Sequence, residues 1–131
     1  MPRPASEYPT KLELEILKVV WKQSPLTVRE IRERMAELGR KSAHTSVITI
    51  LNIMVDKGYL DKKKDGKSYL FWPIIAEEET SQKILGDMVT RVFGGSARNL
   101  VLNLIDGEEI EEDELLELRK LINQKVREQR K

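Results

Sequence analysis

The segment that most restricts the fold of this chain is residues 42–73, SAHTSVITILNIMVDKGYLDKKKDGKSYLFWP. Its first part has the apolar spacing of a single helix, with hydroxyl-bearing side chains in the first turns. Gly58 then provides a helix stop, because glycine readily adopts the left-handed conformation of a C-cap. Strand-like runs at 59–64 and 67–72 flank Asp65-Gly66, a dipeptide typical of tight hairpin turns. The segment is therefore expected to form a helix followed directly by a lysine-rich β-hairpin.

Two more helices are expected before this segment, and each begins with a capping box. Thr10 and Thr27 stand at the N-cap positions, and a glutamate follows each of them three residues later. Apolar residues at helical spacing follow both boxes, so we expect a helix over 11–22 and a second helix that ends at Gly39. Three helices and a terminal hairpin, in this order, predict a mainly α protein with a winged helix-turn-helix domain. The proline-rich residues 1–9 are expected to form a loose arm.

The second half of the chain has a helical period again. Helices are expected over about 77–93 and 111–128, with a short apolar segment at 96–105 between them. These segments carry more apolar residues than they can bury by themselves, which usually marks a surface that binds a partner. We therefore expect a winged-helix DNA-binding domain over 7–73 and a helical dimerisation domain over 74–131, in a two-fold homodimer. The alternative is that these helices fold back onto the first domain. The residues expected at the dimer contact are Ile84, Met88, Val92, Leu100, Leu102, Leu104, Leu115, Leu118 and Ile122.

The charge of the chain is divided unevenly between these two parts. The net charge of +1 hides a first part, residues 1–73, with 14 Lys and Arg against nine Asp and Glu. Residues 74–131 carry nine cations against 13 anions. A basic half joined to an acidic half favours a protein in which one part meets a polyanion and the other does not. Chance segregation on a charge-rich surface is the alternative.

Short polar side chains and nearby cations make the third helix and the hairpin a candidate DNA surface. Thr45, Ser46 and Thr49 share one side of the helix, where hydroxyls and threonine methyl groups can approach base edges closely. The lysines of the hairpin and the basic residues just before the helix would hold phosphates, which adds affinity without reading sequence. Two simpler interpretations stay open: the hydroxyls merely solvate an exposed face, and the lysines merely protect an edge strand from aggregation. The candidate DNA-contacting residues are Arg40, Lys41, His44, Thr45, Ser46, Thr49, Lys62, Lys63, Lys64 and Lys67.

The sequence offers little support for an enzyme or a metal protein. It has no cysteine and a single histidine, His44, which excludes disulfides, thiolate nucleophiles and zinc–sulfur sites. The glutamates at 108–114 lack the alternating ligand pattern of a calcium loop, and no phosphate-binding loop or nucleophile elbow is present. No apolar run has the pattern of a signal peptide or the length of a bilayer span. We expect a cytoplasmic protein without enzymatic activity, cofactor or metal.

Several strings of the sequence together match the pattern of one known family. They are LEILKVVW at 14–21, TVREI at 27–31, AHTSVITILN at 43–52, KGYL at 57–60, and GG at 94–95 followed by LVLN at 100–103. The chain resembles, over about residues 9–125, the penicillinase-repressor family of winged-helix transcriptional regulators, which includes the methicillin-resistance repressor. The resemblance implies a homodimeric repressor that binds palindromic operator DNA in the context of antibiotic resistance. It places Ile48 at a base-reading position beside Thr45, Ser46 and Thr49, and it places Lys62–Lys67 in the wing.

The resemblance also implies how repression is relieved. In members of this family, a membrane-bound sensor metalloprotease can trigger cleavage within the apolar segment of the dimer domain. The bond that matches the cleavage site here is Asn103–Leu104, and a cut there would separate the last helix from the rest of the dimer domain. Two features depart from the family. Ile48 and Ile53 stand where a basic residue is often found, and the C-terminal cysteine cluster of the copper-responsive branch is absent.

Two other functions are compatible with a winged helix. A ligand-gated regulator of the multiple-antibiotic-resistance type would need a pocket between the DNA-binding and dimer regions, and Phe93 is the only aromatic residue available there. A winged-helix protein–protein adaptor would use the hairpin lysines to contact an acidic partner. Competition with random duplex DNA separates the adaptor from both kinds of regulator.

Overall fold

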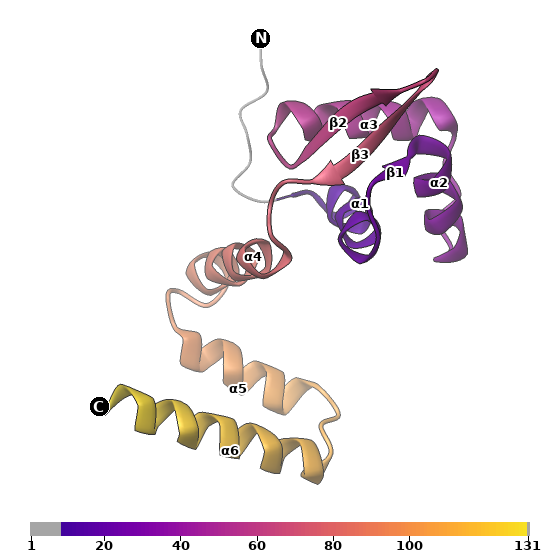
Figure 1. The fold of residues 1–131 in the computed structure, drawn as a ribbon. Coiled ribbons are helices and arrows are strands. Elements are labelled where there is room, and N and C mark those ends of the chain that lie inside the picture. The colour runs from indigo at the N-terminus through magenta and orange to yellow at the C-terminus, as the bar shows by residue number, and fades with distance from the viewer. Residues whose placement is uncertain (1–8, 131) are drawn as a thin grey trace. The chain divides into compact units, whose positions relative to one another are not determined.

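The computed structural model describes residues 9–130 and contains six helices and three strands in that range (Figure 1). In chain order they are α1 (Lys11–Lys22), β1 (Leu26–Thr27), α2 (Val28–Glu37), α3 (His44–Asp56), β2 (Leu60–Asp65), β3 (Ser68–Pro73), α4 (Glu77–Arg91), α5 (Ala97–Gly107) and α6 (Glu112–Gln129). The expected N-terminal arm lies, apart from Pro9, outside the described residues. The chain divides into two compact units, one that ends at Gly86 and one that begins at Asp87.

Both expected capping boxes are present and fix where the first two helices begin. The Thr10 hydroxyl accepts a hydrogen bond from the Glu13 amide, and the Glu13 carboxylate accepts one from the Thr10 amide, at 3.2 and 2.8 Å. Thr27 and Glu30 form the same reciprocal pair, at 3.2 and 3.0 Å. Two of the amide groups that a helix start leaves without intrahelical partners are satisfied in each case. The predicted bounds of α1 are confirmed.

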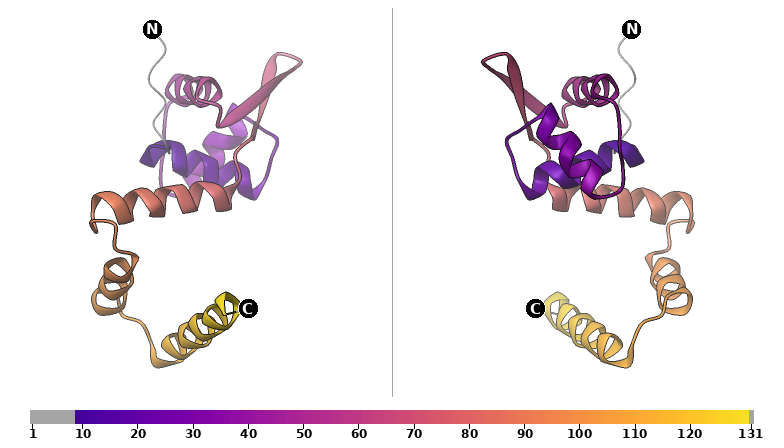
Figure 2. Two further views of the ribbon diagram at one scale, coloured as in Figure 1. Left: turned by 90° about the vertical axis from the view of Figure 1, so that its left-hand side faces the viewer. Right: turned by 90° about the vertical axis from the view of Figure 1, so that its right-hand side faces the viewer.

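The first unit packs its helices and hairpin around a single apolar core. Helices α1, α2 and α3 contribute apolar residues, and the hairpin contributes Leu60 of β2 and Phe71 of β3. The largest completely buried side chains are Ile16, Leu17, Val20, Leu26, Ile31, Val47, Leu51, Met54 and Leu60. In both views of Figure 2, the β2–β3 hairpin projects from this unit beside α3. The element order confirms the predicted mainly α, winged-helix fold.

The sheet differs from the sequence expectation in two details. A two-residue strand, β1, pairs antiparallel with β3, so the sheet has the strand order β1-β3-β2. This strand is too short to give a sequence pattern. The expected turn at Asp65-Gly66 is wrong by one residue, because Asp65 pairs with Ser68 and the turn is Gly66-Lys67. Gly66 has φ +63° at the first central position, which is the glycine position of a type II′ hairpin.

The second unit contains α5 and α6, and neither helix buries a residue within a single chain. The apolar segment expected at 96–105 is helical, and Ser96 caps it by accepting a 3.1 Å hydrogen bond from the Asn99 amide. Large apolar side chains of both helices are exposed, for example Leu104 at 49% and Leu121 at 59%. None of the helices in the described part of the chain has the length and apolar character needed to cross a membrane.

The predicted division into domains at residue 73 coincides with the end of the hairpin. The first compact unit nevertheless extends into α4, because the segment after the hairpin is attached to α1. Nε1 of Trp21 donates a 2.9 Å hydrogen bond to the carbonyl of Ile75, and the Ile75 side chain packs against the core. The assignment of DNA binding to residues 7–73 and of dimerisation to residues 74–131 stays a prediction.

Candidate nucleic-acid interface

Helix α3 turns its polar side to solvent and its apolar side to the core. Val47, Leu51 and Met54 are buried, whereas Thr45 and Ser46 at the start of the helix are exposed. The exposed side also includes His44, the first helical residue, and Thr49, whereas Ile48 is half-buried at its edge. The five predicted base-facing and helix-start residues therefore lie on one continuous part of α3.

The first turn of α3 is free of negative charge. Its N-cap is Ala43, whose side chain makes no capping hydrogen bond, and the turn contains no acidic residue. By contrast, α1, α2, α4 and α6 each carry at least one glutamate in the first turn. A helix start has a partial positive charge and favours anions. The exposed end of α3 is therefore electrostatically suited to approach a phosphate backbone.

The Thr49 hydroxyl has a defined hydrogen-bonding role. Oγ1 of Thr49 donates a 2.9 Å hydrogen bond to the carbonyl of Thr45, one turn earlier. The hydroxyl proton is used inside the helix, so towards a base edge Thr49 can offer an acceptor oxygen and its methyl group. A methyl group at this position suits contact with the methyl group of thymine.

The wing lysines do not form one continuous patch. In the hairpin register, Lys62 lies opposite Phe71, Lys63 opposite Leu70, and Lys64 opposite Tyr69. Successive residues of a strand point to opposite faces, so Lys62 and Lys64 share the face of the hairpin that carries buried Phe71, and Lys63 lies on the other face. Lys67 is in the turn itself.

Three of these lysines are available to a phosphate, whereas the fourth is already bound. The side chains of Lys63, Lys64 and Lys67 are exposed, and their ammonium groups form no hydrogen bond or ion pair with any part of residues 9–130. Lys62 is half-buried, and its Nζ donates a 2.9 Å hydrogen bond to Oδ1 of Asn52 on α3. The same ammonium lies 4.9 Å from the centre of the Tyr69 ring. The sequence pattern does not single out Asn52.

The basic residues before α3 have different environments. Arg40 forms an ion pair with Glu15 of α1, in which Nη2 of Arg40 also donates a 3.1 Å hydrogen bond to Oε1 of Glu15. Lys41 is exposed and makes no such interaction within the described chain. Nε of Arg32 on α2 donates a 3.1 Å hydrogen bond to the carbonyl of Ser42, which holds the loop that leads into α3. This role of Arg32 is not visible in the sequence.

A buried ion pair holds the other end of α3. Nζ of Lys57, the C-cap of α3, lies 3.0 and 2.9 Å from the two carboxylate oxygens of Glu13 on α1. Burial raises the pKa of Glu13, but the Thr10 amide and the Lys57 ammonium together outweigh it and hold this pKa below its ordinary value. The capping box reveals Glu13 in the sequence, but its partner 44 residues away does not follow from any local pattern.

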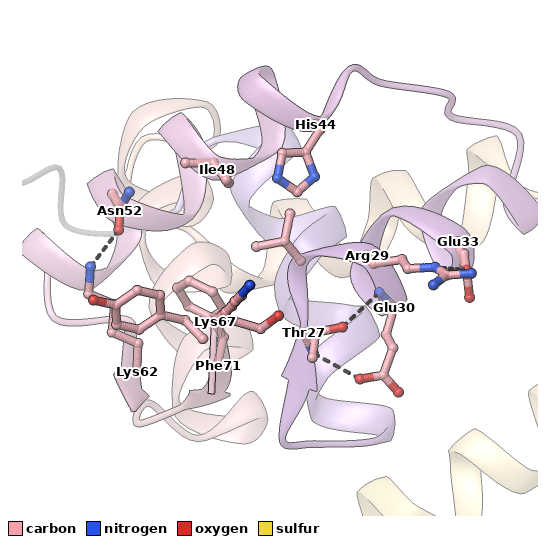
Figure 3. Close-up of a pocket in the computed structure, with 13 residues that line it drawn as sticks. Thr27, Arg29, Glu30, Glu33, His44, Ile48, Asn52, Lys62, Lys67 and Phe71 are labelled. Atoms are coloured by element: carbon pink, nitrogen blue, oxygen red, sulfur yellow. Dashed lines mark hydrogen bonds and ion pairs between the residues drawn. The ribbon is translucent and has the colours of Figure 1, made fainter. Parts of the chain in front are cut away.

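A groove of about 620 Å³ separates α3 from the wing and the start of α2 (Figure 3). Its apolar lining includes Ile48 and Phe71, and its cationic lining residues are Arg29, Lys62 and Lys67. The lining residues are Thr27, Val28, Arg29, Glu30, Glu33, His44, Ile48, Asn52, Lys62, Lys67, Ser68, Tyr69 and Phe71. Glu30 and Glu33 are both engaged, Glu30 by the Thr27 cap and Glu33 by a 3.1 Å ion pair with Arg29. The hydrogen bonds from Thr27 lower the pKa of Glu30.

No set of three or more His, Asp or Glu side chains within residues 9–130 is arranged to hold a metal ion. His44 stands at the edge of the groove, between α3 and the start of α2 (Figure 3). The interface described above consists of hydroxyls, a histidine, an amide and cations. This is the chemistry of groups that contact base edges and phosphates.

The residues predicted for cleavage lie in the middle of α5. Nδ2 of Asn103 donates a 2.8 Å hydrogen bond to the carbonyl of Asn99, and the Asn103–Leu104 peptide bond is part of the helix. The residues predicted for dimerisation are partly or largely exposed within one chain. The half-buried ones are Ile84 and Leu100, and the exposed ones are Met88, Val92, Leu102, Leu104, Leu115, Leu118 and Ile122.

The methicillin resistance regulatory protein MecI of Mammaliicoccus sciuri is 26% identical in sequence to this chain over 113 residues. The matched residues cover 86% of this chain and 91% of that protein. The penicillinase repressor of Bacillus licheniformis is 26% identical over 112 residues, covering 86% and 87% of the two chains. A solved complex of hsRosR-S1 has a similar fold, with a TM-score of 0.51 at 15% identity over 90% of this chain and 92% of that one. The family model described as penicillinase repressor matches residues 9–124. The chain therefore belongs to the penicillinase repressor family, a family of transcriptional repressors.

Proposed function

We propose that this protein represses transcription by binding palindromic operator DNA as a homodimer. The observation that carries this proposal is the exposed, carboxylate-free start of α3 beside a wing with three lysines that are unpaired within residues 9–130. Membership of the penicillinase repressor family supports the same function. In this arrangement, α3 enters the major groove and the wing lies along the adjacent backbone.

Base reading falls to the exposed side of α3. Thr45, Ser46 and Thr49 approach base edges through short side chains, and the half-buried Ile48 offers an apolar contact. His44 stands at the helix start, where it can donate to a phosphate. Because none of these side chains forms the bidentate pairs that arginine makes with guanine, sequence discrimination at each base is expected to be modest.

Phosphate binding falls to exposed cations around α3. Lys63, Lys64 and Lys67 of the wing and Lys41 before α3 are exposed and unpaired within the described residues. Each phosphate that they neutralise releases condensed counterions, so the affinity falls as the salt concentration rises. The expected slope is about 0.9 per phosphate contact on a logarithmic plot.

The dimer is proposed to form through the exposed apolar side chains of the helices after the hairpin. No residue of α5 or α6 is buried in one chain. Leu104 and Ile122, for example, are exposed to 49% and 56%. Exposed apolar surface of this extent favours burial against a second copy. A two-fold dimer presents two α3 helices to two half-sites, which matches the symmetry of a palindrome.

Release of repression is proposed to follow cleavage of the Asn103–Leu104 bond, triggered by a membrane-bound sensor metalloprotease. Proteases bind their substrates in extended form, and this bond lies within α5. Cleavage therefore requires local unwinding of α5. A cut after Asn103 separates α6 from the rest of the chain and removes part of the apolar surface proposed for the dimer.

The function is tested by binding of the full chain to duplex DNA. Sequences enriched from a random duplex pool are expected to contain an inverted repeat, because each protomer reads one half-site. Affinity for the enriched duplex, measured by fluorescence anisotropy, is expected to exceed that for random duplex and to fall with salt. A matched titration with poly-glutamate, which an adaptor for acidic proteins would bind, is expected to show little competition. Failure to bind any duplex at low salt would contradict the proposal.

A further inference from the structure

The Nζ atom of Lys62 bridges two elements that both take part in the proposed DNA interface. It binds Oδ1 of Asn52 on α3 at 2.9 Å, and it lies over the ring of Tyr69 on β3 at 4.9 Å. The ammonium groups of Lys63 and Lys64, in the same run of lysines, have no hydrogen bond or ion pair within residues 9–130. Lys62 is therefore chemically distinct from its neighbours.

The hairpin register explains this difference. Lys62 lies directly opposite Phe71, and Tyr69 is its diagonal neighbour on the same face of the hairpin. Phe71 is only 3% exposed, so this face is turned to the core near the hairpin base. The aliphatic part of the Lys62 side chain extends along this face towards α3, where Nζ meets Asn52. Lys64 shares the face but lies further from the base, and it forms no hydrogen bond with α3 in the described part of the chain.

We propose that Lys62 is a positioning residue that fixes the wing at a set angle to α3, and that, among the wing lysines, only the exposed ones bind phosphate. A hydrogen bond from an ammonium to an amide oxygen is charge-assisted, and contact with an aromatic ring adds to it. Both interactions would break if the ammonium moved away to a phosphate. Lys62 therefore contributes to affinity by restricting the wing before DNA arrives.

The same hydrogen bond sets the orientation of the Asn52 amide. An ammonium group has donors only, so it must face the oxygen of the amide. The NH2 group of Asn52 therefore points away from Lys62. Asn52 therefore presents its NH2 group as a donor to a further partner, while Lys62 occupies one of the two lone pairs of Oδ1. This gives Lys62 an indirect influence on what α3 recognises.

The inference rests on the proposed DNA-binding function, and a salt titration separates positioning from phosphate binding. Lys62→Met keeps the apolar stem and removes the ammonium, and Lys63→Met is the matched control on the opposite face. We expect Lys62→Met to lower the affinity for the enriched duplex about fivefold with an unchanged salt slope. Lys63→Met is expected to reduce the slope by about 0.9 for each phosphate that the protein no longer neutralises. An equal reduction of the slope in Lys62→Met would overturn the proposal.

A second readout uses the free protein and needs no DNA. The chain lacks cysteine, so Lys18→Cys on α1 and Ser68→Cys on the wing introduce a single pair of spin-label sites. Labelled protein is diluted with unlabelled protein to remove distances between protomers. Lys62→Met and Asn52→Ala are each expected to broaden the distance distribution, and Lys63→Met is expected to leave it unchanged.

The double variant Asn52→Ala/Lys62→Met completes the test. Because both residues serve one hydrogen bond, the double variant is expected to bind DNA only slightly more weakly than either single variant. Additive decreases in affinity, or a distance distribution that Lys62→Met does not change, would overturn the positioning role. If the wild-type protein bound no duplex, the proposed function would fail, and the label distances alone would still decide whether Lys62 restricts the wing.

Discussion

The cations near α3 differ in whether they are free to bind a phosphate or are already paired within the protein. The sequence predicts that Arg40 holds a phosphate, but its guanidinium is paired with the Glu15 carboxylate. An exposed ion pair of this kind contributes little stability, about 0–1 kcal/mol. The Glu15 carboxylate therefore competes with a phosphate for the Arg40 guanidinium.

Glu15→Gln is expected to strengthen DNA binding about two- to fivefold, because it frees Arg40 and removes a negative charge near the DNA backbone. The salt slope should become steeper by about 0.9 for each new phosphate contact. Fluorescence anisotropy across a salt series measures both quantities. Adding Arg40→Ala to Glu15→Gln is the control, and a gain that persists in this double variant would show that Arg40 is not responsible.

The Glu13–Lys57 pair makes the stability of the first unit sensitive to acid. The pKa of Glu13 is lowered on folding, so the carboxylate stabilises the fold at neutral pH and this contribution is lost as the pH falls through and below 4.5. Glu13→Gln is expected to lower the free energy of unfolding at pH 7 by about 1–3 kcal/mol. It should also flatten the dependence of this free energy on pH below 4.5.

Urea denaturation between pH 3 and 7 checks this prediction. Glu37→Gln, which removes an exposed carboxylate at the end of α2, is the matched control and is expected to follow the wild-type pH profile. An unchanged profile in Glu13→Gln would mean that the pair is not the source of the acid sensitivity.

For single side chains, the sequence predicts which residue types lie near one another but not which atoms they bind. The run Lys62-Lys63-Lys64 predicts a basic wing, and strand alternation even separates Lys63 from the other two. The hydrogen bond between Lys62 and Asn52 depends on how closely the hairpin approaches α3, which is a matter of core packing. For the same reason, the pairing of Arg40 with Glu15 could not be predicted from local spacing.

The ends of helices and turns are predicted from the local sequence more closely than the partners of side chains are. Capping boxes, glycine stops and apolar spacing predict α1 at its observed bounds, and the last helix is displaced by one residue, from 111–128 to Glu112–Gln129. Strand β1 has no sequence signal, because two residues carry no pattern and its pairing with β3 is set by the tertiary fold. The hairpin turn differs by one residue because Gly66, not Asp65, occupies the position with positive φ.

The stability of helix α5 depends on the cap at its N-terminus. Ser96 is its N-cap, so Ser96→Ala is expected to weaken the helix by about 1 kcal/mol. If cleavage requires α5 to unwind, this change should speed cleavage at Asn103–Leu104 about fivefold, in proportion to the population of the open form. Limited proteolysis followed by mass spectrometry measures the rate.

Ser81→Ala, which changes an exposed serine within α4, is the control and is expected to leave the rate unchanged. Hydrogen exchange of the α5 amides should rise in Ser96→Ala alone. Faster exchange without faster cleavage would show that unwinding does not limit the cut.

The proposed dimer would determine how tightly the molecule holds a palindrome. Ile122 on α6 is 56% exposed in one chain, and a charge at this position would be buried in the proposed dimer. Ile122→Glu is expected to shift the protein to monomer at micromolar concentration, because an unpaired buried charge is strongly unfavourable. Analytical ultracentrifugation measures this shift.

Gln124→Glu adds the same charge elsewhere on the exposed surface of α6 and serves as the control. Ile122→Glu should keep its affinity for a single half-site and lose most of its preference for the full palindrome. A dimer that survives Ile122→Glu would place the dimer interface outside the apolar stripe of α6.

The hydrogen bond from Trp21 to the Ile75 carbonyl has a consequence for how a pull on the helices proposed to dimerise would reach the part proposed to bind the operator. It clamps the strand-to-helix junction at Ile75 to α1, so force applied along α4 is delivered to α1 as well as to the hairpin. The indole is also an optical sensor at this clamp. With Trp72→Phe leaving one fluorophore, its emission would shift to longer wavelength when the junction detaches and water reaches the ring.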